Sequence, residues 1–186
     1  MPERRPRVQA EPPGPNQALE LAARFLATRP RSRWEVRRRL ERSLVTDATL
    51  EHTLGRLEAL GLVDDAAFAR WWREQRDRHA PRGQRMLESE LRAKGVPREV
   101  IEELRDTDPE WAPEEATLPT TEAERARVAL DGHLRGRALP TEAKALQRIG
   151  MYLMRRGFDP ATARSVVRER AAAGDSAAGE LAADAD

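Results

Sequence analysis

The stretch "ELRAKGVPREVIEEL", residues 90–104, carries the pattern that decides the fold. It matches "YLMRRGFDPATARSVV", residues 152–167, when the turn 94–96 is placed over the turn 156–158. In both copies, apolar residues at helical spacing lie on either side of a glycine, which is typical of two helices joined by a tight turn. Divergent repeats of roughly fifty residues predict an elongated helical array.

A third and weaker copy lies nearer the N-terminus. "RLERSLVTDATLEHTL", residues 39–54, follows the same pattern but has Leu44 where the other two copies have glycine. Each copy is preceded by a further helix-like segment, and no strand-like alternation competes with the helical spacing. The sequence therefore predicts an all-α protein, an elongated array of three tandem three-helix repeats.

Helix starts and ends are marked clearly along the chain. Residues 32–35 and 121–124 each read as a capping box, in which a hydroxyl and a carboxylate satisfy each other's backbone N–H groups. Asn16 is the expected cap of the first helix, and Gly61 the expected left-handed terminator of the third. Pro160 follows an aspartate, so it should take the first position of the last helix.

Composition separates the repeats from the segments around them. The N-terminal residues are rich in proline and arginine, and the segment "DTDPEWAPEEATLP" is acidic and proline-rich. The predicted division is a disordered tail at 1–15, three-helix repeats at 16–63, 64–105 and 120–170, an acidic Pro-rich linker at 106–119, and a disordered tail at 171–186.

The bulk properties suit thin helical units better than one thick core. Charged residues make up 35% of the 186 residues, aromatic residues only 4%, and the net charge is +1. The absence of cysteine excludes disulfides and thiolate metal sites and fits a reducing compartment. With neither a signal-like apolar segment nor a stretch of membrane-spanning length, we expect a cytoplasmic protein.

Two adjacent carboxylates, Asp64 and Asp65, are the first candidates for chemistry. They lie in "GLVDDAAFARWW", residues 61–72, between a glycine and a helix-like segment. An acid/base or metal pair would need further acids or histidines converging on it. Aspartates at a helix start cap free N–H groups and favour the helix dipole, so we interpret this pair as structural.

No other pattern supports catalysis. His52, His79 and His133 are scattered without metal-ligand spacing, and the serines lack a nucleophile-elbow context. The chain has neither a phosphate-binding glycine loop nor a dinucleotide fingerprint. The sequence therefore predicts a protein that is not an enzyme and has no metal or cofactor.

The aromatic residues of residues 61–72 allow two interpretations. Phe68 and Trp72 are four residues apart and are expected in the core. Trp71 lies on an adjacent face, where it could anchor a partner, stack on a base, or be partly buried against the preceding repeat. The sequence leaves these alternatives open.

Clustered arginines are the most suggestive functional feature. They gather on the tryptophan helix and on the next one, where guanidinium groups can pair with phosphates or with carboxylates of a protein partner. Glutamates and aspartates are interspersed, so the same arginines can also form i, i+4 pairs on a solvated surface. Charge alone does not decide between the two.

Residues 61–104, "GLVDDAAFARWWREQRDRHAPRGQRMLESELRAKGVPREVIEEL", resemble the central repeat of the RecX regulatory proteins. That family's pattern has a Gly-x-x-Asp-Asp turn, then x-x-Phe-Ala, an arginine-bearing helix, a Pro-Arg turn and Leu-Arg-x-Lys-Gly-Val. "RPRSRWEVRRRLERS", residues 29–43, is similar to the family's opening motif. "LMRRGFDPATARSVV", residues 153–167, is similar to its closing helix pair.

This resemblance implies a non-enzymatic, monomeric regulator that binds the RecA recombinase filament, with single- and double-stranded DNA as secondary, electrostatic partners. Inhibition of the filament's ATPase, strand-exchange and coprotease activities would modulate DNA repair, recombination and the SOS response. The alternative is a helical DNA-binding protein acting directly on nucleic acid, and a third is a structural adaptor. The contact residues we expect come from the central repeat: Arg70, Arg73, Arg76, Arg82, Arg85, Arg92 and Lys94.

Overall fold

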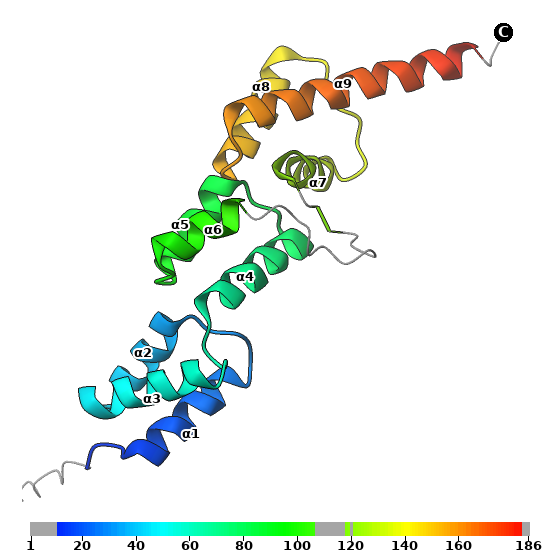
Figure 1. Cartoon of the computed structure of the whole chain (residues 1–186). Helices are drawn as coiled ribbons and strands as arrows, with labels where there is room; N and C mark the ends of the chain where they lie inside the picture. The colour runs from blue at the N-terminus through cyan, green and yellow to red at the C-terminus, as the bar shows by residue number, and fades with distance from the viewer. Residues whose placement is uncertain (1–10, 107–117, 120, 184–186) are drawn as a thin grey trace, which may run out of the picture. The chain divides into compact units, whose positions relative to one another are not determined.

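The structure is a computed structural model that describes residues 11–106, 118–119 and 121–183. These residues form nine α-helices and no strand, which confirms the all-α prediction (Figure 1). Most of the predicted linker at 106–119 lies outside the described residues. The helices are α1 (Pro15–Leu26), α2 (Arg33–Arg42), α3 (Asp47–Ala59), α4 (Asp65–His79), α5 (Gln84–Ala93), α6 (Arg98–Asp106), α7 (Glu122–Leu134), α8 (Ala143–Arg155) and α9 (Pro160–Ala183).

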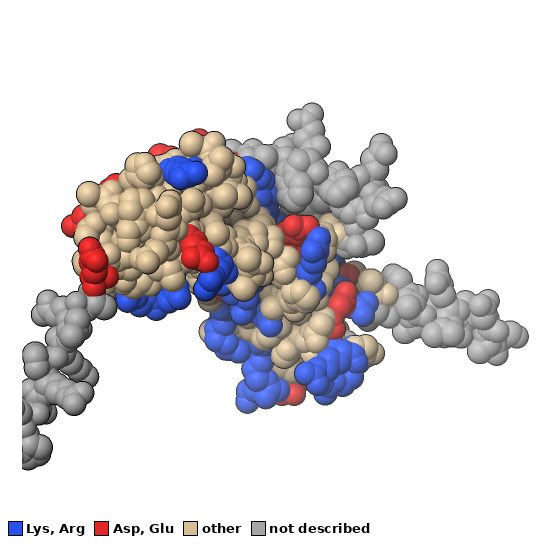
Figure 2. Space-filling view, turned by 90° about the horizontal axis from the view of Figure 1, so that it is seen from below, with Lys and Arg blue, Asp and Glu red and all other residues tan. Residues whose placement is uncertain are grey.

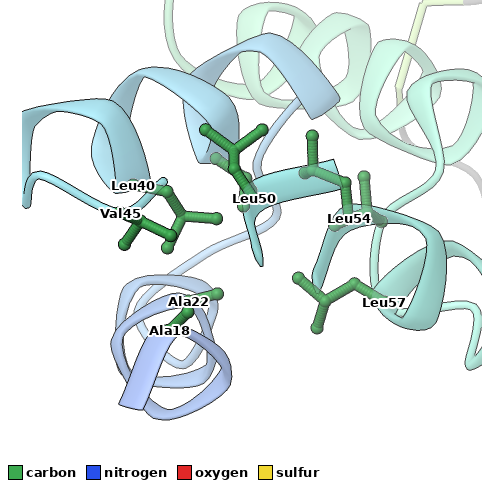
Figure 3. Close-up of a cluster of buried hydrophobic side chains, with 9 residues drawn as sticks. Ala18, Ala22, Leu40, Val45, Leu50, Leu54 and Leu57 are labelled. Atoms are coloured by element: carbon green, nitrogen blue, oxygen red, sulfur yellow. The ribbon is translucent and has the colours of Figure 1, made fainter. Parts of the chain in front are cut away.

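The described residues divide into two compact units. The first comprises the chain up to Phe68 together with the turn Lys94–Val96. Its core is built by α1, α2 and α3, whose small and branched side chains meet in one cluster (Figure 3). Leu40, Leu54 and Leu57 are fully buried there, and burial of each such side chain contributes about 1.5–3 kcal/mol.

The second unit comprises Ala69 to Ala93 and the described residues from Pro97 onward. Its larger cluster joins α7, α8 and α9 through side chains such as Leu130, Leu153 and Phe158. On α5 and α6, Leu87, Leu91, Ile101 and Leu104 are also buried. Both units therefore hold helices together by apolar stripes at the spacing that the sequence displays.

Local sequence signals fix several helix ends. Both predicted capping boxes form, at Ser32 with Glu35 and at Thr121 with Glu124. Gly61 adopts the left-handed conformation with φ +66°. The prediction for α1 is wrong: the cap residue is Gly14 rather than Asn16, because Pro15 takes the first helical position.

The last helix is longer than expected. α9 begins at Pro160, after Asp159 accepts backbone N–H bonds from Ala161 and Thr162, as predicted. It then continues to Ala183, whereas we expected a disordered tail from residue 171. The extension is rich in alanine, which has the highest helix propensity of all residues.

The three aligned turns share one backbone conformation. Leu44, Gly95 and Gly157 have φ values of 58°, 72° and 90°, all in the left-handed region. Glycine enters this region freely, whereas a leucine there is strained by about 1–2 kcal/mol. The first copy of the repeat thus keeps the turn even though it lacks the glycine.

Close packing explains why glycine occupies two of these turns. A Cβ atom at Gly95 would lie 2.3 Å from the Cβ of Trp34 in α2. A Cβ atom at Gly157 would lie 2.4 Å from the Cβ of Met86 in α5. Leu44 is 76% exposed, so the turn of the first copy has room for a side chain.

Hydrogen bonds attach each glycine turn to the start of the helix it packs against. Ser32 Oγ, at the N-terminus of α2, donates to the carbonyl oxygen of Lys94 at 2.6 Å. The backbone N–H of Gly83, just before α5, donates to the carbonyl oxygen of Arg156 at 3.0 Å. Within each unit, the turn of one repeat therefore packs on the second helix of the repeat before it.

We predict that Leu44→Gly raises the free energy of unfolding by about 1 kcal/mol. The substitution relieves left-handed strain of about 1–2 kcal/mol and loses little packing at an exposed position, while glycine's greater freedom in the unfolded chain offsets part of the gain. Urea denaturation of the two proteins measures the difference. Gly95→Ala is the matched opposite change, and its added Cβ should destabilise the chain through Trp34. If the Leu44→Gly protein is less stable than the parent, the left-handed backbone at Leu44 does not strain the folded state.

Candidate functional site: the arginine-bearing second repeat

Asp64 holds the start of the arginine-bearing helix α4. Its Oδ1 accepts the backbone N–H groups of Ala66 and Ala67 at 2.8 and 3.0 Å. These are among the N–H groups that a helix leaves without internal partners. The capping interpretation of the aspartate pair is therefore confirmed for Asp64.

Asp65 does something different, so the interpretation of both acids as caps of one helix is wrong. Its Oδ1 accepts the backbone N–H of Arg33, the first residue of α2, at 2.8 Å. Burial raises the pKa of Asp65, and the Arg33 N–H bond opposes part of that increase. The carboxylate thus satisfies the start of a helix in the preceding repeat.

The same bond occurs once more, further along the chain. Glu122, the first residue of α7, accepts the backbone N–H of Gln84, the first residue of α5, at 3.1 Å. In both cases the first residue of a repeat's first helix supplies a carboxylate to the second helix of the repeat before it. Asp64 and Asp65 are structural carboxylates, and the described residues contain no acid or histidine cluster able to hold a metal ion.

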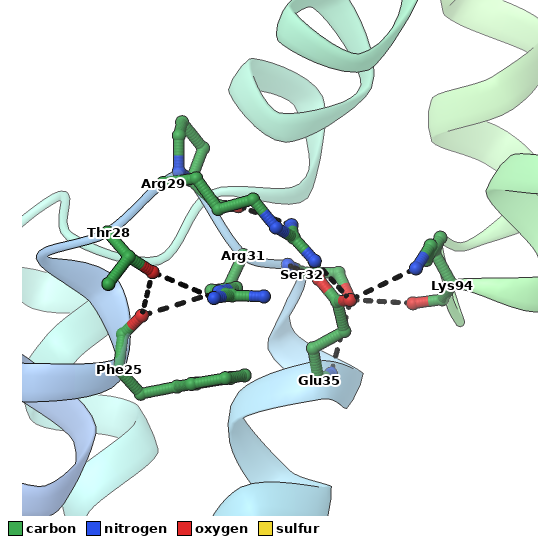
Figure 4. A network of polar contacts seen from close by, with 8 residues as sticks. Phe25, Thr28, Arg29, Arg31, Ser32, Glu35 and Lys94 are labelled. Carbon is green, nitrogen blue, oxygen red and sulfur yellow. Dashed lines mark hydrogen bonds and ion pairs between the residues drawn. The ribbon is translucent and has the colours of Figure 1, made fainter.

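A buried polar network surrounds the start of α2 (Figure 4). Arg29 donates to both carboxylate oxygens of Glu35, at 2.8 and 3.2 Å, and Lys94 Nζ donates to Oε1 at 3.2 Å. Burial alone would raise the pKa of Glu35, but these two cations outweigh it and lower the pKa. Lys94, which we expected to contact a partner, is therefore engaged within its own unit.

Glu90 forms ion pairs with two of the expected contact arginines. Arg76 Nε donates to its Oε2 at 2.7 Å, and Arg82 Nε lies 3.8 Å from its Oε1. Trp72 Nε1 also donates to Oε2, at 2.9 Å, and the Arg76 guanidinium lies 4.7 Å from a Trp72 ring centroid. Phe68 is in the core as predicted, whereas Trp72 is half-buried and forms part of this polar cluster.

A second internal cluster contains Arg73. It donates to the carbonyl oxygen of Leu104 at 3.2 Å, and burial lowers its pKa, with help from nearby Arg125. Asp77 and Arg125 are both less than 9% exposed and lie 4.0 Å apart, Oδ1 to Nε. Burial raises the pKa of Asp77 to about 6, although Arg125 and Arg73 pull the value down.

The remaining expected contacts lie on the surface. Arg70 and Arg85 are exposed, and neither forms an ion pair with a carboxylate in the described part of the chain, although the charge of Arg85 helps to lower the pKa of Asp159. Arg92 is also exposed but bonds to Glu88 at 2.8 Å. On the face in Figure 2, Lys and Arg side chains cover more of the surface than Asp and Glu side chains, and several of the basic groups lie next to one another.

Sequence spacing did not identify the acids that anchor these arginines. Glu88 and Glu90 are two of the interspersed acids that the sequence makes available for i, i+4 pairs on a solvated surface. Glu88 does form such a pair with Arg92, but it also binds Arg105 of α6, and Glu90 binds groups on α4. Partners on different helices leave no periodic signal.

Within the described residues, no helix has the length and apolar character needed to cross a membrane.

Comparison with known proteins decides the family. The family models for the first and second three-helix domains of RecX match residues 18–57 and 64–104. A "Regulatory protein RecX" from Thermobifida fusca is 35% identical, with 91% of each chain covered. Another from Mycobacterium avium is 34% identical over 90% of this chain and 92% of its own. The chain belongs to the RecX family.

Solved RecX structures share the fold. The crystal structure of RecX from Lactobacillus salivarius aligns with a TM-score of 0.68 at 16% identity, covering 84% of this chain and 96% of its own. A second RecX crystal structure gives a TM-score of 0.64 at 18% identity, covering 82% of this chain and 70% of its own. The relatives are named as regulatory proteins, and this family membership is what the resemblance of residues 61–104 predicted.

We predict that Asp65→Ala lowers the free energy of unfolding by about 1 kcal/mol, because the Arg33 N–H loses its carboxylate acceptor. Asp65→Asn keeps an oxygen at the same place and should lose less. Chemical denaturation of the three proteins measures the effect. Equal stability of Asp65→Ala and the parent would mean that the Arg33 bond contributes nothing.

We also predict that Asp77 makes the free energy of unfolding fall as the pH rises. Its folded-state pKa of about 6 exceeds its usual value of 3.8, so the folded chain holds this proton more tightly than the unfolded chain. The resulting stabilisation is complete below about pH 4 and is lost as the pH rises through about 6, a change of up to about 3 kcal/mol.

Asp77→Asn tests this loss of stability with rising pH because the asparagine amide does not titrate. Relative to the parent, the free energy of unfolding of Asp77→Asn should rise between about pH 4 and pH 7 by an amount approaching that change. The control is Asp131→Asn, which removes an exposed carboxylate paired with Arg170; a rise as large as that of Asp77→Asn would show that the effect is not specific to Asp77. Parallel pH profiles for Asp77→Asn and the parent would contradict the assignment.

Proposed function

We propose that this protein binds the RecA recombinase filament and inhibits its ATPase, strand-exchange and coprotease activities. In this role it acts in the cytoplasm as a non-catalytic, monomeric regulator of DNA repair, recombination and the SOS response. Single- and double-stranded DNA are secondary partners, held by charge. No metal or cofactor takes part.

Family membership is the observation that carries this proposal. The relatives covering most of this chain are named regulatory proteins, and family models match both of its first two repeats. The resemblance of the central motifs implies the RecA filament as the partner. A helical-repeat protein suits such a partner because stacked repeats offer extended surfaces that can follow a polymer.

The arginines of the second repeat divide into two roles under this proposal. Arg73, Arg76, Arg82 and Lys94 are half-buried and bond within the chain, so their charges serve its internal packing: Arg76 and Arg82 at Glu90 of α5, Arg73 at Leu104 of α6, and Lys94 at Glu35 of α2. Arg70, Arg85 and Arg92 point their charge to solvent, and Arg92 shares its charge with Glu88. We propose Arg70 and Arg85 as the principal contacts, because pairing them with a partner breaks no internal bond.

A titration of RecA ATPase tests the function. The protein is added to filaments already assembled on single-stranded DNA, and ATP hydrolysis is followed as its concentration rises. We expect inhibition at concentrations well below those that coat the DNA. Inhibition only when the DNA is saturated would favour the alternative, a helical DNA-binding protein that acts on nucleic acid directly.

We predict that Arg70→Glu combined with Arg85→Glu raises the concentration needed for half-inhibition by about tenfold or more, since contact arginines often contribute about 2 kcal/mol. The control is Arg164→Glu combined with Arg168→Glu. These arginines are exposed on α9, and their substitution changes the net charge by the same amount. Circular dichroism confirms that each variant is folded. Equal losses in both variants would assign the effect to net charge and reject Arg70 and Arg85 as specific contacts.

A further inference from the structure

A cationic pocket lies in the third repeat, outside the residues matched by the family models. It has a volume of about 860 Å³ and is lined by α7, α8 and the loop between them. Arg137, Arg148 and Arg155 all line it, and none of its lining residues is aspartate or glutamate. This volume is in the range of pockets that bind ligands.

The charges of the three guanidinium groups are not balanced by any acid in the pocket lining. No carboxylate in the described chain pairs with any of them. Arg137 Nε donates to the carbonyl oxygen of Leu134 at 3.2 Å, which fixes the base of its side chain while leaving its other N–H groups available. Arg148 and Arg155 are seven residues apart on α8, so they lie on one face, about 10 Å apart along the helix axis.

Two other arginine-lined hollows in the described chain have their charges neutralised by acids in the same hollow. One contains Arg127 and Arg170, which pair with Glu169 and Asp131 from the same hollow. Another, between α5 and α6, contains arginines that bond to Glu88 and Glu102. The pocket of α7 and α8 differs because its lining carries positive charge alone.

Flat and polarisable side chains lie beside these arginines. The rings of His133 and Tyr152 stack with centroids 4.0 Å apart, and both line the pocket. His133 is exposed, and Met151, which is 44% exposed, lies one residue before Tyr152. Guanidinium groups beside an exposed ring are the combination that binds phosphates and stacks bases of a single strand.

We propose that this pocket binds single-stranded nucleic acid, with phosphates on Arg137, Arg148 and Arg155 and a base against His133. An acidic peptide would satisfy the cations but would not use the ring, so the observations favour a nucleic acid. The proposal builds on the proposed function by placing the DNA contact in the third repeat. It concerns DNA alone, so it can be tested without the recombinase.

Fluorescence anisotropy with a labelled oligothymidylate and the full chain tests the pocket. Arg148→Gln combined with Arg155→Gln should weaken binding by about tenfold. It should also reduce the slope of log K against log salt by about 1.4, since each phosphate contact on a single strand contributes about 0.7. The matched control is Arg164→Gln combined with Arg168→Gln on α9, which should leave the slope nearly unchanged.

His133→Ala separates a nucleic acid from other polyanions. Loss of base stacking should weaken oligothymidylate binding about fivefold or more while the salt slope stays the same. Polyglutamate is the competitor that represents an acidic peptide. If it displaces the oligonucleotide equally well and His133→Ala binds like the parent, the pocket is a site for acidic protein and our assignment is overturned.

Equal effects of the pocket variant and the α9 control would also overturn the proposal, because binding would then follow net charge. These outcomes are independent of the filament assay. If the parent protein inhibits preformed RecA filaments but the pocket variant binds oligothymidylate as tightly as the parent, the pocket proposal is rejected and the proposed function stands. The reverse pattern would support the pocket and reject the filament.

Discussion

The structure depends on how the second helix of each of the first two repeats begins. A helix starts with backbone N–H groups that have no partner inside the helix. At α2 and α5, the first of these groups donates to a carboxylate that opens the next repeat, from Asp65 and from Glu122. A glycine turn of that next repeat packs against the same helix start. The unpaired N–H group at each of these helix starts is thus satisfied by a carboxylate far along the chain, and this bond links one repeat to the next.

This joint also explains the pattern of glycine in the aligned turns. Gly95 and Gly157 combine a left-handed backbone with a close approach that excludes a Cβ atom. Leu44 shares the backbone conformation without the close approach, so its exposed side chain is tolerated at the cost of strain. The glycine is therefore required by packing between helices, and the turn itself forms without it.

Charge in this protein is used first for structure. In the second repeat, Glu88 and Glu90 hold arginines from three helices, and in the first unit Glu35 holds Arg29 and Lys94. Cations left without an acid are therefore the informative ones for binding. Among the arginines considered for binding, those without an ion pair to a described carboxylate include Arg70 and Arg85 on the second repeat and the three that line the pocket of α7 and α8. Both proposals follow from this separation.

The sequence by itself determined the helical fold, both capping boxes and the family, because these depend on residues within a few positions of each other. Ser32 with Glu35 is such a case. Only the tertiary structure decided which charges are free. Arg76 meets Glu90 fourteen residues away, and Asp65 meets Arg33 thirty-two residues away. Packing between helices sets such pairs, and it leaves no periodic mark on the sequence.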